Sequence, residues 1–418
     1  MPGLLPDVDP DGLLEYSVVY TDHALNHMSA KFQRAMNEIS AQLKSVYGAR
    51  SAVIVPGSGT FGMEAVARQF ATGQKIVVVR NGWFSFRWSQ ISQMGGIAAG
   101  ETVLAARPVL SAQPVLTAQP VLTAQPVLTA QPMLNAQPVL TAQPVLTAQP
   151  VAGADQAPFA PAPVEEVVAA IERERPGVVF VPHVETASGL LLPDPYLLRV
   201  SAAARKVDAL LVVDCIASGA LWLDMKQLGI DVLISAPQKG WSGSPCCALV
   251  LLGERARERI EHTQSTSFAC DLRKWLQVME AYEAGGHLYH ATLPTDSLLR
   301  LSTSLRQTRE MGFERAREAQ QELGKRVRAA LEKAGFPSVA AVGYQAPGVV
   351  VSYTRDPDIA SGKKFRELGL QSAAGVPLQC GEPASFRTFR LGLFGLEKLQ
   401  NIDRTVATLE RALAQLAR

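Results

Sequence analysis

Short apolar runs alternate with helical patterns along most of this sequence, and this alternation most limits its possible folds. The strand-like runs are SAVIVP, KIVVVR, VVFVP, ALLVVD and DVLISA. Apolar residues recur at helical spacing between them, as in FGMEAVARQF and PVEEVVAAIERERPG, and also from His27 to Val46. Such alternation is typical of an α/β fold, in which a mainly parallel sheet carries helices on its faces.

The 418 residues are enough for two domains. A long, charged helical pattern runs from Leu298 to Lys333 and is followed by mixed strands and helices, with a final helix from Asn401. We therefore expect an N-terminal segment at 1–25, a large domain at 26–295 and a smaller C-terminal α/β domain at 296–418.

A proline repeat interrupts the large domain. From Pro108 to Pro150 a proline recurs every sixth residue, in units close to PVLTAQ, and no charged residue lies between Arg107 and Asp155. A β-solenoid of hexapeptide units is one interpretation. The units lack glycine, however, and each proline removes a backbone donor from a sheet. This favours a low-complexity, extended or disordered insert at 108–157, in which we expect no catalytic residue.

Composition argues against several functional classes. The net charge of +2 gives no reason to expect a nucleic acid or an anionic membrane as partner. The opening MPGLLPDVDPDGLLEY does not resemble a secretory signal, and no apolar run is long enough to span a bilayer. The five cysteines are odd in number and form no CxxC pair, so we expect reduced thiols in a cytoplasmic protein.

Asp214 and Lys239 stand where chemistry is expected in such a fold. Asp214 directly follows one apolar run, and Lys239 follows the next after Ala-Pro-Gln. Ligands of parallel sheets bind at the carboxyl ends of the strands, so both side chains should face one crevice. A buried carboxylate opposite a lysine suits pyridoxal 5′-phosphate (PLP), whose ring nitrogen the carboxylate keeps protonated and whose aldehyde forms a Schiff base with the lysine. Taken singly, each residue could equally be structural.

The segment PGSGTFGMEAV adds a glycine-rich turn between a strand and a helix. Its backbone N–H groups and the hydroxyls of Ser58 and Thr60 could bind an anion at the helix N-terminus. No lysine follows the glycines, so this is not the GxxxxGK[ST] nucleotide loop, and it is not a convincing dinucleotide fingerprint. A tight structural connection is the alternative.

These motifs form an ordered set that resembles a known family. The set comprises the Gly-Ser-Gly turn, an aromatic residue after Asn-Gly, HVETASG, DCIAS, SAPQK, YHATLP and an arginine before Leu-Gly. It resembles the class V aminotransferases of PLP fold type I, in particular the alanine–glyoxylate and serine–glyoxylate group. The resemblance runs from about Asn26 to the C-terminus, broken by the repeat, and implies a large domain with a mainly parallel sheet and a smaller α/β domain.

The resemblance also implies roles for single residues. Lys239 matches the Schiff-base lysine, Asp214 the partner of the ring nitrogen, and Thr186 the ligand of the ring hydroxyl. Phe84 matches the aromatic stacked on the ring, with Trp83 as the neighbouring alternative. The phosphate ligands come from the glycine-rich turn and from the position before the lysine: Ser58, Gly59, Thr60 and Gln238.

Further matches concern the substrate and a second subunit. Arg390 matches the arginine that binds the substrate carboxylate, with Arg387 nearby. Tyr289 and Thr292 match residues that reach the phosphate of the neighbouring subunit, which implies a homodimer with shared active sites. Asn26 and His27 are weaker candidates for the substrate site. His183 and Glu185 suggest a metal, but no third ligand is in view, and we expect none.

The resulting hypothesis is a transaminase. It would move an amino group between a small amino acid, alanine or serine-like, and a 2-oxo acid such as glyoxylate or pyruvate, with Lys239 transferring the α-proton. Two segments depart from the family pattern, EYSVVYTDHALNHMS and WSGSPCCA, so the cofactor is better supported than the amino donor.

Two other functions stay open. One is a PLP-dependent cysteine desulfurase or lyase that uses Cys380, which lies ten positions before Arg390. The other is a scaffold whose proline repeat binds partners, although the repeat lacks PxxP spacing and basic flanks.

Overall fold

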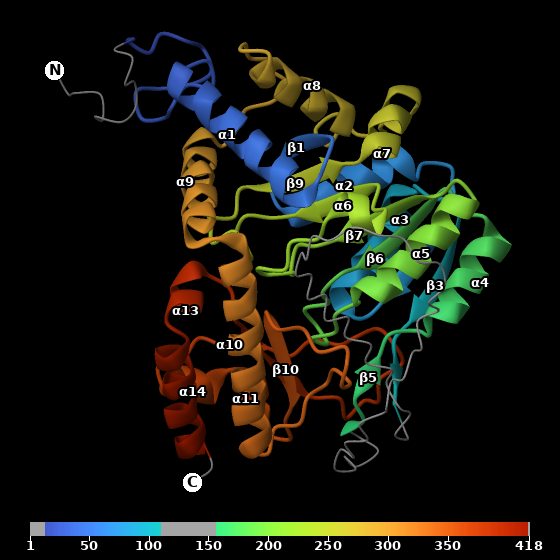
Figure 1. Cartoon of the computed structure of the whole chain (residues 1–418), viewed down its shortest axis with the longest axis vertical. Coiled ribbons are helices and arrows are strands. Elements are labelled where there is room, and N and C mark those ends of the chain that lie inside the picture. Colours follow the sequence, from blue (N-terminus) through green and yellow to red (C-terminus); the bar gives the residue numbers. More distant parts are fainter. Residues whose placement is uncertain (1–12, 110–155, 417–418) are drawn as a thin grey trace, which may run out of the picture.

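The computed structural model describes residues 13–109 and 156–416, and it confirms the α/β prediction. In these residues a seven-stranded sheet lies between helices, and a three-stranded sheet follows it in the C-terminal part (Figure 1). None of the described helices combines the length and the apolar character needed to cross a bilayer. The proline-rich insert was predicted at 108–157. Of these residues, 110–155 lie outside the described part of the chain.

The large sheet is mainly parallel. Its strand order is β1-β9-β8-β7-β6-β2-β3, and β9 is antiparallel to both of its neighbours. The strands are β1 (Ser51–Pro56), β2 (Lys75–Arg80), β3 (Gly100–Ala105), β6 (Val178–Pro182), β7 (Leu210–Asp214), β8 (Val232–Ser235) and β9 (Cys247–Leu252). Every residue of β6, β7, β8 and β9 is buried, which explains why these strands are continuous apolar runs. The sequence analysis did not predict β9.

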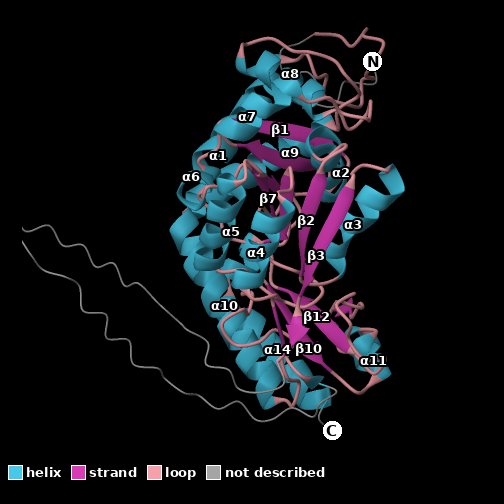
Figure 2. Ribbon diagram, turned by 90° about the vertical axis from the view of Figure 1, so that its right-hand side faces the viewer, coloured by secondary structure: helices cyan, strands magenta, loops and turns pink. Residues whose placement is uncertain are grey.

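Helices cover both faces of this sheet. Figure 2 shows α4 and α5 on one side and α2 and α3 on the other. Gly62 permits the close approach of α2 to the sheet, because a Cβ there would lie 2.4 Å from Cβ of Ala248. The helices of this part are α1 (Ala30–Tyr47), α2 (Gly59–Phe70), α3 (Trp83–Gly95), α4 (Val164–Glu174), α5 (Asp194–Lys206), α6 (Met225–Leu228), α7 (Glu254–Arg259) and α8 (Leu272–Glu283).

The C-terminal part surrounds an antiparallel sheet of order β10-β12-β11. Its elements are α9 (Thr295–Met311), α10 (Phe313–Lys333), β10 (Val349–Tyr353), α11 (Pro357–Ala360), α12 (Lys363–Glu367), β11 (Ala373–Ala374), β12 (Thr388–Gly392), α13 (Leu396–Gln400) and α14 (Ile402–Leu416). The helical pattern at 298–333 proves to be two helices, separated at Gly312, whose φ of 89° ends the first. The boundary at 295/296 stays a prediction.

The two described flanks of the proline repeat lie side by side. Strand β4 (Arg107–Pro108) pairs antiparallel with β5 (Phe159–Ala160), and the Val109 N–H donates to the Pro158 carbonyl over 2.7 Å. The described segments on either side of the repeat therefore meet, and β3 contacts α4.

Candidate active site

Lys239 and Asp214 lie at the same edge of the large sheet. Asp214 is the last residue of β7, and Lys239 lies in the turn that follows β8. The two strands are parallel neighbours, with Asp214 opposite Ile234. The two side chains interact electrostatically. Lys239 lowers the pKa of Asp214, and Asp214 raises the pKa of Lys239. The fold thus brings the two residues together, and we call their surroundings the Lys239 crevice.

Burial and neighbouring charges shift the protonation of both groups. Burial raises the pKa of Asp214 to about 7, although its carboxylate accepts a hydrogen bond of 2.9 Å from the Ile216 N–H. Burial also lowers the pKa of Lys239, and Arg390 and Arg87 lower it further. Because the neutral amine is the nucleophilic form of lysine, this environment favours attack on a carbonyl carbon.

Two arginines share the crevice with Lys239. Cζ of Arg87, from α3, lies 4.8 Å from the centre of the Phe84 ring, and Cζ of Arg390, from β12, lies 5.5 Å from it. In the described residues no carboxylate lies within 4 Å of the charged nitrogens of Lys239, Arg87 or Arg390. These three basic groups outnumber the nearby carboxylates of Asp214 and Glu185, which suits an anionic ligand.

Arg87 was missed by the sequence analysis. It lies one helical turn after Phe84, so both side chains share a face of α3, and this spacing was the available signal. Its Nη1 donates to the Thr60 hydroxyl over 3.0 Å. Arg87 thereby connects the aromatic residue to the glycine-rich turn.

The glycine-rich turn forms the N-terminus of α2. Ser58 has an extended backbone, and its hydroxyl makes no capping bond to the helix. A Cβ at Gly59 would lie 2.4 Å from Cδ1 of Ile216, in the segment after Asp214, so the turn packs tightly there. Oε1 of Gln238 is buried and has no hydrogen-bond partner in the described chain. A ligand that meets these groups would satisfy orphaned polar atoms.

Glu185 fixes the start of α3 and is a second residue whose role the sequence did not reveal. The carboxylate is fully buried and accepts hydrogen bonds from the backbone N–H groups of Phe84, Ser85 and Ala187 over 3.2, 2.8 and 2.9 Å. It therefore positions Phe84 rather than binding a ligand itself. Thr186, partly buried, follows it directly.

Of the two aromatic candidates, Phe84 is the one that both arginines approach. Trp83 packs instead against Phe86, with ring centres 5.9 Å apart. His183 points elsewhere than Glu185 and shares a hydrogen bond of 2.7 Å with Ser218. Within residues 13–109 and 156–416 no three His, Cys, Asp or Glu side chains are grouped as metal ligands.

Comparison with known proteins assigns the family. The model of the class V aminotransferase family matches residues 160–355. A 2-aminoethylphosphonate–pyruvate transaminase from Burkholderia ambifaria is 31% identical over 265 residues, which cover 63% of this chain and 68% of that protein. The chain belongs to the class V aminotransferase family. This family is PLP-dependent, so the crevice around Lys239 is where the cofactor of such an enzyme would be sought.

Other relatives of this family member agree. The alanine–glyoxylate aminotransferase of Oryctolagus cuniculus is 26% identical over 269 residues, 61% of this chain, and the match spans 64% of that relative's length. The crystal structure of an alanine–glyoxylate aminotransferase from Nostoc sp. matches with a TM-score of 0.69 at 20% identity and covers 93% of this chain and 88% of that one. A ureidoglycine–glyoxylate aminotransferase from Bacillus subtilis gives the same TM-score, 20% identity and coverage of 93% and 87%. These structures confirm fold type I.

Four of the predicted site residues, Asn26, His27, Tyr289 and Thr292, lie together away from Lys239. The His27 ring lies 5.8 Å from that of Tyr289, whose hydroxyl is 3.1 Å from the Thr292 hydroxyl. Asn26 donates to Glu15 over 2.8 Å. Tyr289 is 50% exposed. In the described part of the chain, no hydrogen bond, ion pair or ring contact joins these residues to Lys239 of the same subunit.

Arg387 and Cys380 are the two remaining candidates from the sequence. Arg387 is exposed and donates to the Arg355 carbonyl over 2.8 Å. Burial raises the pKa of the Cys380 thiol to about 12, and its Sγ lies 3.5 Å from the Arg80 carbonyl oxygen. A thiol of high pKa is a poor nucleophile, so the desulfurase alternative loses its support.

Proposed function

We propose that this chain is an aminotransferase that binds PLP covalently through Lys239. The observation that carries the proposal is the pair of Lys239 and Asp214, a lysine of lowered pKa and a buried carboxylate at the ends of adjacent parallel strands. Membership in a PLP-dependent family supports it.

The residues of the crevice suit this cofactor. The phosphate would lie at the N-terminus of α2, where the ligands are Ser58, Gly59, Thr60 and Gln238. Arg87, beside Thr60, supplies a positive charge there. Phe84 offers a flat platform for the ring, Asp214 an acceptor for the ring nitrogen, and Thr186 a hydroxyl for the ring hydroxyl. When bound, PLP supplies an electron sink for the bonds at the substrate Cα.

The chain's own groups would then handle the substrate. Arg390 presents a guanidinium group that no carboxylate in the described chain occupies, which suits bidentate binding of a substrate carboxylate. Its Nε donates to the Ala374 carbonyl over 2.8 Å, so the planar group is held in orientation by β11. Lys239 would take the proton from Cα of the amino donor in one half-reaction and deliver a proton to Cα of the 2-oxo acid in the other, and the same arginine would bind the carboxylates of both substrates in turn.

We also propose a homodimer in which each subunit completes the other's site. Tyr289, Thr292, Asn26 and His27 lie together near the surface, beside a hollow of about 550 Å³. Apolar side chains are exposed around it, including Tyr16, which is 88% exposed. A second copy would cover this surface and bring the four residues to its own Lys239 crevice. The free cysteines fit the cytoplasmic location that we propose.

For the substrates, we propose a small amino acid, alanine or serine-like, and glyoxylate or pyruvate as acceptor. This rests on the relatives named alanine–glyoxylate aminotransferase and 2-aminoethylphosphonate–pyruvate transaminase. Stopped-flow spectra of the holoenzyme with alanine, serine and 2-aminoethylphosphonate would rank the donors. Conversion of the cofactor by none of them would refute the substrate proposal.

The covalent attachment can be tested directly. The purified protein with PLP should show a visible absorption band, and borohydride should fix the cofactor to the peptide that contains Lys239, as found by mass spectrometry. Lys239→Ala should lose both signals, whereas Lys333→Ala, an exposed lysine at the end of α10, should keep them. A Lys239→Ala protein that still forms the reducible adduct would refute the proposal.

A further inference from the structure

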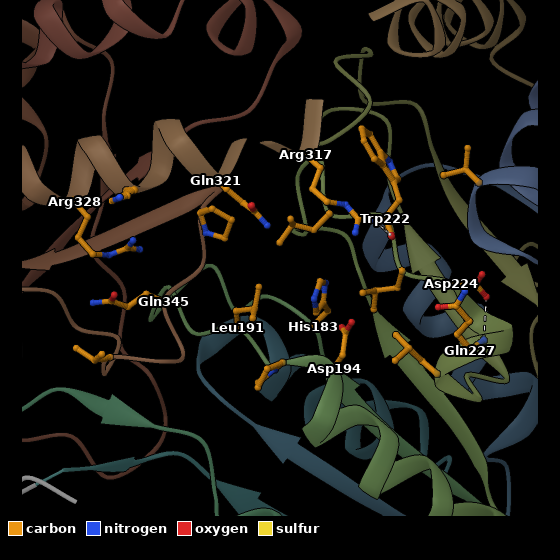
Figure 3. Close-up of a pocket in the computed structure, with 18 of the residues that line it drawn as sticks. His183, Leu191, Asp194, Trp222, Asp224, Gln227, Arg317, Gln321, Arg328 and Gln345 are labelled. Carbon is orange, nitrogen blue, oxygen red and sulfur yellow. Dashed lines mark hydrogen bonds between the residues drawn. The ribbon is translucent and has the colours of Figure 1, made fainter. Parts of the chain in front are cut away.

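A cavity separate from the Lys239 crevice lies elsewhere in the described chain. It measures about 1010 Å³ and lies between α10 and the loops that follow β6 and β7. None of the residues proposed to bind PLP or substrate lines it. Figure 3 shows Arg328 and Gln345 at one end, Asp224 and Gln227 at the other, and His183 and Asp194 between them. The volume is that of an ordinary small-molecule site.

One wall of the cavity is a polar and basic face of α10. Arg317, Gln321, Lys325 and Arg328 follow one another at spacings of four, four and three, so their side chains share one side of the helix. Such a row on a surface helix is usually a solvated face. Here the row borders a cavity, and part of it is removed from water.

Arg328 is the most informative member of this wall. One Nη donates to the Ala346 carbonyl over 2.8 Å, while Nε is buried without a hydrogen-bond partner. No carboxylate of the described residues lies within 4 Å of the guanidinium. Its burial lowers its pKa to about 10, which reflects a charge held away from water without full compensation. An anion in the cavity would supply that compensation.

The carboxylates near the cavity do not fill this role. Asp224 caps α6, and its Oδ1 accepts from the N–H groups of Lys226 and Gln227 over 2.9 and 3.0 Å. Asp194 lies in the first turn of α5, where the helix dipole stabilises a negative charge. Glu332 lies one turn after Arg328 on α10. It raises the pKa of Arg328, but burial lowers that pKa by more. The Arg328 end of the cavity thus remains cationic.

The middle of the cavity combines apolar and polar side chains. Leu191 and Pro193 line it from the loop before α5, and Trp222 lines it from the loop after β7, beside His183 and Asp194. A ligand that occupies the whole volume could therefore combine a charged group with an apolar body that lies along Leu191 and Pro193.

We propose that this cavity binds an amphipathic organic anion, whose carboxylate or phosphate group pairs with Arg328 and Lys325 and whose body lies against Leu191 and Trp222. The site is separate from the cofactor crevice, and the inference holds whether or not the chain is an aminotransferase.

The position of His183 gives this site a route to the cofactor crevice. His183 lines the cavity, and its Nδ1 is 2.7 Å from the hydroxyl of Ser218, in the segment that begins at Asp214. Its backbone N–H also donates to the Asp214 carbonyl over 2.8 Å. His183 therefore lies between this cavity and Asp214, the residue proposed to hold the ring nitrogen.

Calorimetric titration of the PLP-loaded protein tests the binding. The probes are 1-naphthyl phosphate, 1-naphthoate and neutral 1-naphthol, with inorganic phosphate as the head group alone. We expect saturable binding of at least one naphthyl anion, roughly tenfold or more tighter than naphthol or inorganic phosphate. The two anions distinguish a phosphate from a carboxylate ligand. Equal affinity for naphthol, or no saturable binding of either anion, would overturn the proposal.

Variants locate the bound anion. Arg328→Gln and Lys325→Gln should each weaken binding of the preferred anion about tenfold, whereas Lys333→Gln, the same charge change outside the cavity on the same helix, should not. Lys325 is exposed, so its variant reports even if Arg328→Gln impairs folding. Unchanged affinity in Lys325→Gln and in a folded Arg328→Gln protein would place the anion elsewhere and refute the site.

Discussion

Asp214→Asn offers a sharp test of the electrostatics, because it should stabilise the cofactor-free chain while it harms the holoenzyme. The carboxylate is only 7% exposed, and it accepts a hydrogen bond from the Ile216 N–H. Asparagine has nearly the same shape and keeps an oxygen that can accept this bond. The variant therefore changes charge and little else.

The magnitude follows from the pKa of Asp214. Burial raises that pKa from 3.8 to about 7, and each pKa unit corresponds to about 1.4 kcal/mol, so ionisation of Asp214 destabilises the folded chain by roughly 4 kcal/mol above pH 7. Since the folded-state pKa is the higher one, this loss is absent below pH 4 and develops as pH rises from about 4 to about 7. Asparagine avoids this loss of stability. It buries an amide NH₂ group without a hydrogen-bond acceptor, however, which costs about 1–3 kcal/mol at every pH.

Urea unfolding of the cofactor-free proteins at pH 4.5 and pH 8 measures the balance. The variant should be about 1–3 kcal/mol more stable than the wild type at pH 8 and equal or less stable at pH 4.5, so that the two stability curves cross. With saturating PLP the order at pH 8 should reverse, because only the wild type can pair an ionised carboxylate with the ring nitrogen. Parallel curves for the cofactor-free proteins would refute the reasoning.

Three further substitutions test other contacts. Arg87→Gln removes a positive charge that lowers the pKa of Lys239, so the pH profile of PLP capture should move to higher pH, and Arg87→Lys should restore it; an unmoved profile would contradict this electrostatic role. Gly324→Ala places a Cβ 2.4 Å from the Pro347 carbonyl oxygen and should cost about 1–3 kcal/mol, read as a lower urea midpoint; an unchanged midpoint would show that α10 can shift. Cys380→Ala should keep transaminase activity, and its loss would revive a role for the thiol.

The strands of the large sheet were predictable where the chain is apolar on both faces. β6 and β7 are fully buried, so their runs of valine and leucine stand out from the helices between them. β9 is equally apolar yet was missed, because a short apolar run beside unusual paired cysteines carries no period that distinguishes a strand. The sequence also could not predict that β1 lies at the sheet edge beside β9, because strand pairing depends on segments distant in sequence.

The candidate site divides in the same way. Asp214 and Lys239 follow directly from strand ends, and their neighbours in the motif set follow from the family resemblance. Arg87 does not, because it reaches the crevice from the second turn of a helix, and only its contacts with Thr60 and Phe84 reveal it. The cavity along α10 is likewise made by segments distant in sequence.

The sequence by itself determined the α/β class, the lysine and aspartate at two strand ends, and the family, because these depend on local patterns and short motifs. Only the tertiary structure decided the charges around Lys239, the second cluster at Tyr289 and the cavity beside Arg328. A pKa, a burial or a cavity depends on which distant side chains share a small volume, and that is set by packing across the whole chain.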